Sequence, residues 1–203
     1  NECTKPITAY SAQKGLNQLK TGLNYITRKQ GPGRQNFLES GAFLKSRKEL
    51  DRPDLQLHLV AAIMIDHGNT RVEKDGFTIH ACQLRPESLG TIALKSADPF
   101  AEPAIDPNYL ATDLDMRTMR EAVKISRDVA NQKPLAFLRG AEIRPGLDVK
   151  TDAEIDAWIR QTAETIYHPV GTCRMGADDR AVVDETLKVR GIEGLRVVDA
   201  SVM

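Results

Sequence analysis

The chain has 203 residues, with 28 basic and 28 acidic side chains, so its formal net charge is zero. This length is enough for one domain with its own hydrophobic core. No basic patch or run of like charges stands out, which argues against nucleic acid as the main partner. No apolar run approaches the length that a transmembrane helix requires.

Three cysteines, Cys3, Cys82 and Cys173, lie far apart in the sequence. Their spacing fits neither a zinc motif nor a disulfide framework. The simplest interpretation is three reduced thiols, which is typical of a cytoplasmic protein. His80 and Cys82 would share one face of a strand, but no motif supplies the remaining ligands of a metal, so we predict no metal site.

The first predicted element is a helix over residues 11–29, which ends at the Gly-Pro-Gly turn of residues 31–33. Its large apolar side chains recur every three or four residues and form one stripe: Leu16, Leu19, Leu23 and Ile26.

Strands follow in the middle of the chain. Residues 55–65 alternate between apolar and polar and then become uniformly apolar, which predicts a strand that passes from half-buried to buried. Residues 77–84 alternate again, and residues 91–94 indicate a further strand. Residues 98–108 contain three prolines and are expected to be extended and irregular.

A second helix is predicted over residues 113–131, from its amphipathic pattern. A third begins at a capping box, Thr151 followed by Glu154, and leads the chain to His168. Residues 195–198 form a last short apolar strand. Strands joined by turns, with separate helices, predict an α+β domain with a mainly antiparallel sheet backed by helices.

The segment that carries most chemistry surrounds His168, which lies between Tyr167 and Pro169. Imidazole titrates near neutral pH, so it can take and return a proton. The following proline keeps His168 out of the helical region, which fixes the backbone that aims the ring. A rigidly aimed imidazole suits a proton-abstracting enzyme. The alternative is a histidine that only hydrogen-bonds a turn.

Three blocks in order carry a resemblance to a known family: residues 84–110, 168–176 and 194–203. Together they resemble the C-terminal half of the glucose–methanol–choline (GMC) oxidoreductases, which are flavoenzymes that oxidise alcohols. The resemblance runs from about residue 39 to residue 203. It implies the same antiparallel sheet backed by helices.

The resemblance also implies a domain organisation. Residues 1–180 would form the substrate-binding domain, and residues 181–203 would begin the return into the FAD-binding domain. The Rossmann half is expected to be absent. The only Gly-x-Gly, in residues 31–33, has no strand before it, and Asn36 occupies the position of the third glycine. We therefore expect a fragment of a larger enzyme.

The implied reaction is oxidation of a primary alcohol to an aldehyde, with FAD as hydride acceptor and His168 as the base. Residues 66–68 and 76–84 look closer to aliphatic alcohol dehydrogenases, and the oxidation of choline to betaine aldehyde is the alternative. A non-catalytic binding domain of the same fold is the alternative from another class. In either enzyme, the fragment alone is expected to be inactive.

Four further residues receive roles from the resemblance. Asp199 and Ala200 would approach FAD; the alternative, which is compatible with the first, is that Asp199 caps a helix that begins just beyond residue 203. Glu39 and His58 would line the substrate cavity; otherwise they are a solvated loop carboxylate and an outward-facing strand residue.

The expected partners are a small-molecule alcohol and the missing FAD-binding half of the same polypeptide. The apolar face that meets this half predicts self-association of the isolated chain, so an oligomer is compatible with the sequence. The expected location is the cytoplasm, with attachment to the periphery of the inner membrane as the alternative.

Overall fold

The computed structural model describes the whole chain except residues 39 and 71. The described residues form an α+β fold with antiparallel sheets, which confirms the predicted fold class. They divide into two compact units: residues 1–87 with 112–162, and residues 88–111 with 163–203.

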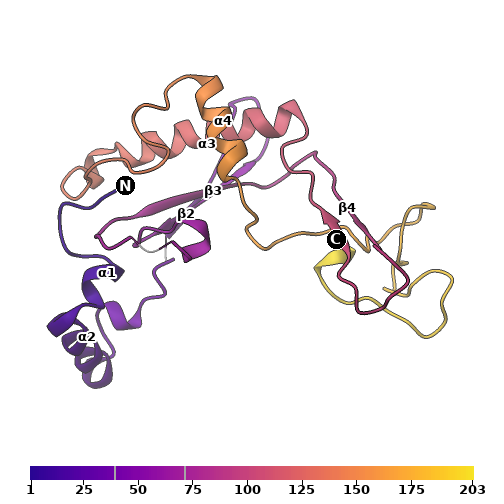
Figure 1. The fold of residues 1–203 in the computed structure, drawn as a ribbon, viewed down its shortest axis with the longest axis horizontal. Helices are drawn as coiled ribbons and strands as arrows, with labels where there is room; N and C mark the ends of the chain where they lie inside the picture. The colour runs from indigo at the N-terminus through magenta and orange to yellow at the C-terminus, as the bar shows by residue number, and fades with distance from the viewer. Residues whose placement is uncertain (39, 71) are drawn as a thin grey trace. The chain divides into compact units, whose positions relative to one another are not determined.

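The first unit is built on a three-stranded antiparallel sheet with the order β1–β2–β3 (Figure 1). The strands are β1 (Ser40–Leu44), β2 (Leu55–Val60) and β3 (Thr78–Gln83). Leu55 and Leu57 of β2 are buried, as the alternating pattern predicts for one face of a strand. The sheet therefore has one strongly apolar face.

The strand predicted over residues 55–65 ends at Val60 instead. The hydroxyl of Thr78 accepts a hydrogen bond from the Met64 amide and donates one to the Ala62 carbonyl, each at 2.9 Å. This side chain takes up backbone groups that a longer ladder would have used, so the chain turns away after Val60.

Helix α3 (Asp113–Ala130) packs on β3 and β2, and α4 (Asp152–Thr162) packs on α3 (Figure 1). The second predicted helix is confirmed to within one residue. Its N-cap is Thr112, whose hydroxyl accepts a hydrogen bond from the Asp115 amide at 3.2 Å. This cap satisfies one of the free amides of the first turn.

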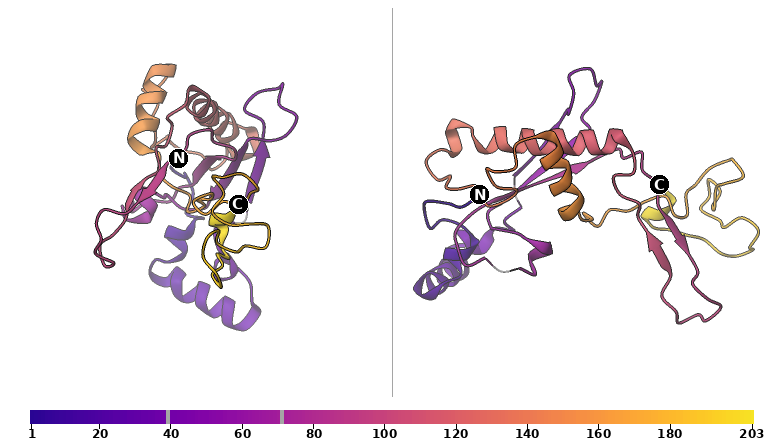
Figure 2. Two further views of the ribbon diagram at one scale, coloured as in Figure 1. Left: turned by 90° about the vertical axis from the view of Figure 1, so that its right-hand side faces the viewer. Right: turned by 45° about the horizontal axis from the view of Figure 1, so that its top comes forward.

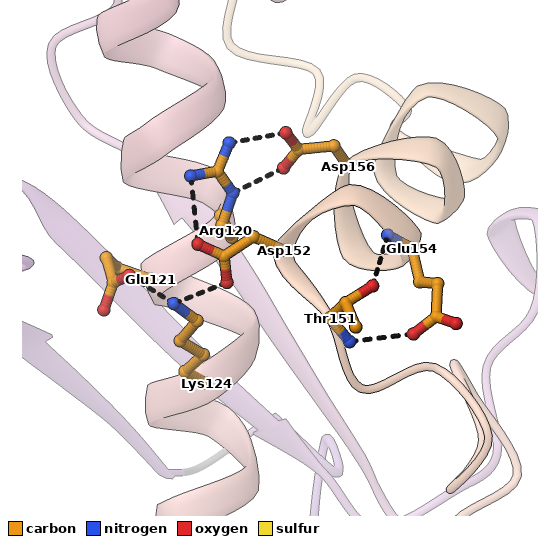
Figure 3. Close-up of polar contacts among 7 residues, drawn as sticks. All are labelled: Arg120, Glu121, Lys124, Thr151, Asp152, Glu154 and Asp156. Atoms are coloured by element: carbon orange, nitrogen blue, oxygen red, sulfur yellow. Dashed lines mark hydrogen bonds and ion pairs between the residues drawn. The ribbon is translucent and has the colours of Figure 1, made fainter.

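Charged side chains join α3 to α4 (Figure 3). Arg120 of α3 donates from Nε and Nη2 to the two carboxylate oxygens of Asp156, with an Nε–Oδ1 distance of 2.6 Å. The Asp152 carboxylate forms ion pairs with Arg120 Nη1, at 3.4 Å, and with Lys124 Nζ, at 2.9 Å. A two-pronged guanidinium–carboxylate pair fixes relative orientation better than a single contact, so it sets how the two helices cross.

The start of α4 confirms the predicted capping box (Figure 3). The Glu154 amide donates to the Thr151 hydroxyl at 3.3 Å, and the Thr151 amide donates to the Glu154 carboxylate at 2.8 Å. These reciprocal bonds satisfy two amides that the helix leaves unpaired. The helix ends at Thr162, so residues 163–167 reach His168 as irregular chain rather than as helix.

The helix predicted over residues 11–29 is broken into α1 (Ala9–Ala12) and α2 (Gly15–Arg28). The break falls at Gly15, whose φ of +50° is readily adopted by glycine but strains most other residues. The predicted apolar stripe of α2 is on the surface of the described chain, with 65 to 73% exposure for its members: Leu16, Leu19, Leu23 and Ile26.

The second unit contains β4 (Thr91–Ala93) and β5 (Ala104–Asp106), which pair antiparallel (Figure 2). The strand β5 lies inside the stretch expected to be irregular. The strand predicted over residues 195–198 is reduced to one bridge, between Lys188 and Arg196.

Four short 3₁₀ turns complete the described elements: η1 (Pro32–Arg34), η2 (Asp66–Gly68), η3 (Lys133–Leu135) and η4 (Ala200–Val202). Within the part of the chain that the structure describes, no helix is both long enough and apolar enough to cross a bilayer.

Candidate active site

His168 lies in the second unit, in an irregular segment that presents its side chain to solvent. The Tyr167 amide donates to the Thr165 hydroxyl at 3.0 Å, and Tyr167 takes the left-handed conformation with a φ of +64°. The local turn and the following Pro169 together restrict the backbone on both sides of the histidine. The chain therefore delivers an accessible imidazole from a constrained loop.

The rest of this loop is held by the end of the chain. The Cys173 amide donates to the Ser201 carbonyl at 2.9 Å, and the Met175 amide donates to the Val202 carbonyl at 2.8 Å. These two bonds bring together sequence blocks that lie more than twenty residues apart. The structure thus joins the loop of His168 to the turn that contains Asp199 and Ala200.

Asp199 caps the short turn η4. Its carboxylate accepts hydrogen bonds from the Ser201 amide, at 2.8 Å, and from the Ser201 hydroxyl. These bonds stabilise the ionised form, so the pKa of Asp199 is lowered from its usual value. Asp199 thus caps a short 3₁₀ turn within the chain, and its carboxylate is an acceptor on the protein surface, while its approach to FAD stays a prediction.

Sequence reasoning missed a pair that stiffens the same loop. Arg174 donates from Nη1 and Nη2 to the two carboxylate oxygens of Asp178, at 3.0 and 2.5 Å. The hydrogen bonds from Arg174 lower the pKa of Asp178 to about 2. The four-residue spacing of opposite charges was the available signal, although the pair closes a loop here rather than a helix turn.

His58 lies in the first unit, in the middle of β2, opposite Gly41 of β1 and His80 of β3. It is half-buried, and its Nε2 atom is buried without a hydrogen-bond partner among the described residues. His58 is therefore only partly accessible to solvent, and its place in a substrate cavity stays a prediction. Glu39, the other predicted substrate residue, lies outside the described residues.

The three cysteines are unbridged in the described chain. Burial raises the pKa of the Cys82 thiol and of the Cys3 thiol, which keeps both in the neutral form at physiological pH. In the described residues, no group of three or more His, Cys, Asp or Glu side chains is arranged to hold a metal ion.

The sequence around this loop is similar to that of a known protein family. The sequence model of the GMC oxidoreductases matches residues 86–203, which include the His168 loop and the Asp199 turn. The chain is a member of the GMC oxidoreductase family. This confirms the resemblance that the three sequence blocks indicated.

Its relatives extend well beyond the length of this chain. The oxygen-dependent choline dehydrogenase of Cronobacter sakazakii is 43% identical over 202 residues, which cover 100% of this chain and 36% of that protein. The mitochondrial choline dehydrogenase of Mus musculus is 43% identical over 203 residues, covering 99% of this chain and 34% of that protein. The chain thus spans about a third of the length of these relatives.

The fold agrees with that of a solved flavin-containing enzyme. Formate oxidase from Aspergillus oryzae RIB40 superimposes with a TM-score of 0.87 and 28% identity, covering 100% of this chain and 40% of that one. The GMC chain described here therefore corresponds to the C-terminal, substrate-binding part of such enzymes, without the part that binds FAD.

Proposed function

We propose that this chain is the substrate-binding part of an FAD-dependent enzyme that oxidises a primary alcohol to an aldehyde, with His168 as the base. The observation that carries the proposal is the accessible imidazole of His168 in a loop tied by backbone hydrogen bonds to the Asp199 turn. Both belong to the segment that matches the GMC family.

Oxidation of the alcohol removes a proton from its hydroxyl group and a hydride from its carbon atom. A neutral imidazole nitrogen of His168 takes the hydroxyl proton, and the carbon-bound hydrogen leaves with its electron pair. FAD, when bound, supplies the acceptor for that hydride. The positive charge that His168 gains stabilises the negative charge that develops on the substrate oxygen. The protein therefore contributes the base and its orientation.

The residues near the end of the chain suit a flavin nucleotide as far as they extend. The ionised Asp199 carboxylate can accept a hydrogen bond from a hydroxyl group, and Ala200 offers backbone at the same exposed turn. The pyrophosphate needs a glycine-rich turn between a strand and a helix, whereas Gly31 and Gly33 flank a 3₁₀ turn that follows α2. FAD binding would thus require further polypeptide.

We propose the same division of the chain as the sequence suggested, with residues 1–180 as the substrate-binding domain and residues 181–203 as the start of the return into the FAD-binding part. Residues 66–68 and 76–84 favour an aliphatic primary alcohol as substrate. Choline is the second candidate, and the 43% identity to choline dehydrogenases favours it.

The test is anaerobic stopped-flow reduction of the flavin in the full-length enzyme, with 1-octanol and with choline. We expect His168→Ala to slow flavin reduction by about 10²- to 10⁴-fold, and added imidazole to restore part of the rate. His67→Ala is the matched control, because His67 is also an exposed histidine and lies in the first unit.

Unchanged reduction in His168→Ala would show that another group takes the proton. A higher specificity constant for choline than for 1-octanol would select the second candidate. Failure of both alcohols to reduce the flavin would favour the non-catalytic binding domain.

A further inference from the structure

Helix α2 turns polar side chains toward the protein and its apolar stripe toward solvent. It packs on α1 and on the turn η1 (Figure 1). Asn17 Nδ2 donates a hydrogen bond to the Ser11 carbonyl of α1 at 3.2 Å. Thr21 Oγ1 donates one to the Ala12 carbonyl of α1 at 3.3 Å. An amphipathic helix of a globular protein normally does the reverse and buries its apolar stripe, so α2 is inverted.

The apolar stripe of α2 is uncovered in the described chain. Its members are between 65 and 73% exposed: Leu16, Leu19, Leu23 and Ile26. They recur at steps of three and four residues, so they form one row on the helix surface. At 1.5 Å per residue the row is about 15 Å long. Contiguous apolar surface of this kind marks a site that meets a protein or a membrane.

The charge around this stripe has one sign. Residues 3–38 contain six basic side chains and no acidic one, although the formal charge of the whole chain is zero. The six are Lys5, Lys14, Lys20, Arg28, Lys29 and Arg34. Among the described residues, only Lys14 of this set has an ion-pair partner, Glu73 at 3.7 Å. The segment therefore presents a local excess of positive charge beside exposed hydrocarbon.

Two of these cations border the stripe itself. Lys20 follows Leu16 by four residues and precedes Leu23 by three, so it is their neighbour on the helix surface. Lys29, at the C-cap, follows Ile26 by three residues. Both lysines are exposed, and their flexible stems can hold the ammonium groups above the level of the leucines. An apolar row with raised cations fits a partner that has an anionic outer layer over an apolar interior.

We propose that α2 docks on the surface of a membrane that contains anionic phospholipids. The helix lies along the surface, its four apolar side chains enter the boundary between headgroups and acyl chains, and its lysines stay at the level of the phosphates. A second copy of the chain would bring two basic segments together, so it would gain nothing from their charge. The stripe drives association of isolated chains only where no lipid competes. The proposal does not depend on the chemistry of His168.

The test is flotation of the full-length enzyme with lipid vesicles. Vesicles of phosphatidylcholine with about 30% phosphatidylglycerol should bind the enzyme at least about tenfold more tightly than vesicles of phosphatidylcholine alone. A rise in NaCl from about 0.1 to about 0.5 M should weaken binding to the anionic vesicles at least about fivefold, because salt screens exposed charges. Equal binding to both kinds of vesicle, or binding to neither, would overturn the proposal.

Substitutions in α2 test the apolar and the charged contributions separately. Leu19→Gln should weaken binding to the anionic vesicles about tenfold, because it forfeits much of the burial of one leucine in the lipid. Lys20→Gln with Lys29→Gln should weaken it about tenfold to thirtyfold, since each cation near an anionic surface contributes about fivefold. Wild-type binding by either variant would overturn the proposal.

Matched controls remove the same kinds of side chain elsewhere in the first unit. Leu147 is 69% exposed and Leu19 is 71% exposed, so Leu147→Gln removes an equally accessible leucine outside α2. Lys45→Gln with Lys48→Gln removes two exposed lysines between β1 and β2 and changes the net charge by the same amount. Both should bind within about twofold of the wild type. Losses as large as those of the α2 variants would count against a docking site on α2.

Hydrogen exchange locates the contact in the wild type, so it decides if a variant fails to fold in a thermal unfolding scan. The amides of α2 should exchange at least about threefold more slowly with anionic vesicles present, and those of α3 should be unchanged. No added protection in α2 would overturn the proposal. Cover by other polypeptide of the full-length enzyme would do so too: α2 would then be protected without lipid, and Leu19→Gln would lower the unfolding temperature.

Cover by a second copy would appear as a dimer of the full-length enzyme that Leu19→Gln dissociates and that does not float with vesicles, which would also overturn the proposal. Failure of the proposed function would look different. The enzyme would then float with anionic vesicles, but neither alcohol would reduce its flavin.

Discussion

Replacement of Asp115 by alanine should separate α3 from the sheet. Asp115 is 1% exposed, and its Oδ1 atom accepts hydrogen bonds from Gln83 Nε2 at 2.8 Å and from the Glu87 amide at 2.9 Å. A hydrogen bond to a charged acceptor contributes about 1.5–3 kcal/mol to stability. Two of them give about 3–6 kcal/mol, and because Glu87 is exposed and can be rehydrated, we expect the lower end, about 3 kcal/mol.

Urea unfolding followed by the fluorescence of Trp158 measures this loss, because Trp158 is the only tryptophan of the chain and lies on α4. With a urea m-value of about 2 kcal/mol/M, the midpoint should fall by about 1.5 M. Asp113→Ala is the control: Asp113 is an exposed acidic residue in the same helix turn, and its loss should cost less than about 1 kcal/mol. Equal midpoints for the two variants would refute the assignment of Asp115 as the link between helix and sheet.

Three further predictions concern the loop, the helix stripe and the isolated chain. Arg174→Gln should raise the pKa of Asp178 from about 2 towards the usual carboxyl value, as measured by ¹³C NMR titration. Because the pKa is lowered in the folded protein, the pair stabilises the fold above the ordinary carboxyl pKa, and this stabilisation is lost as the pH falls through about 2. A pKa that stays near 2 in the variant would show that Arg174 is not the cause. The exposed stripe of α2 should make the isolated chain self-associate, and Leu19→Lys with Leu23→Lys should reduce the mass seen by light scattering; a monomeric wild-type chain at high concentration would contradict this. The isolated chain with added FAD and an artificial electron acceptor should oxidise no alcohol, and turnover above a His168→Ala control would count against that expectation.

Local sequence signals predicted the elements that depend on local physics. The apolar periodicity indicated α3, and Thr151 with Glu154 indicated the start of α4. The alternation at the start of residues 55–65 and over residues 77–84 indicated β2 and β3, although β2 ends at Val60. In each case the chain's own pattern of side chains selects the conformation, so neighbouring residues carry enough information.

Elements that depend on distant partners were missed or misplaced. The strand β1 has five residues and includes Gly41, so it has little strand preference of its own and depends on the ladder with β2. The end of β2 at Val60 depends on Thr78, which lies eighteen residues later. The join between the His168 loop and the Asp199 turn uses backbone groups, which leave no mark in a side-chain pattern.

The backbone character of that join has an evolutionary consequence. Because the amides of Cys173 and Met175 make the contacts, almost any side chain can occupy these positions without loosening the loop. Proline is the exception, since it has no amide hydrogen to give. The side chains of this segment can thus change while the path of its main chain, and with it the placement of His168, stays the same.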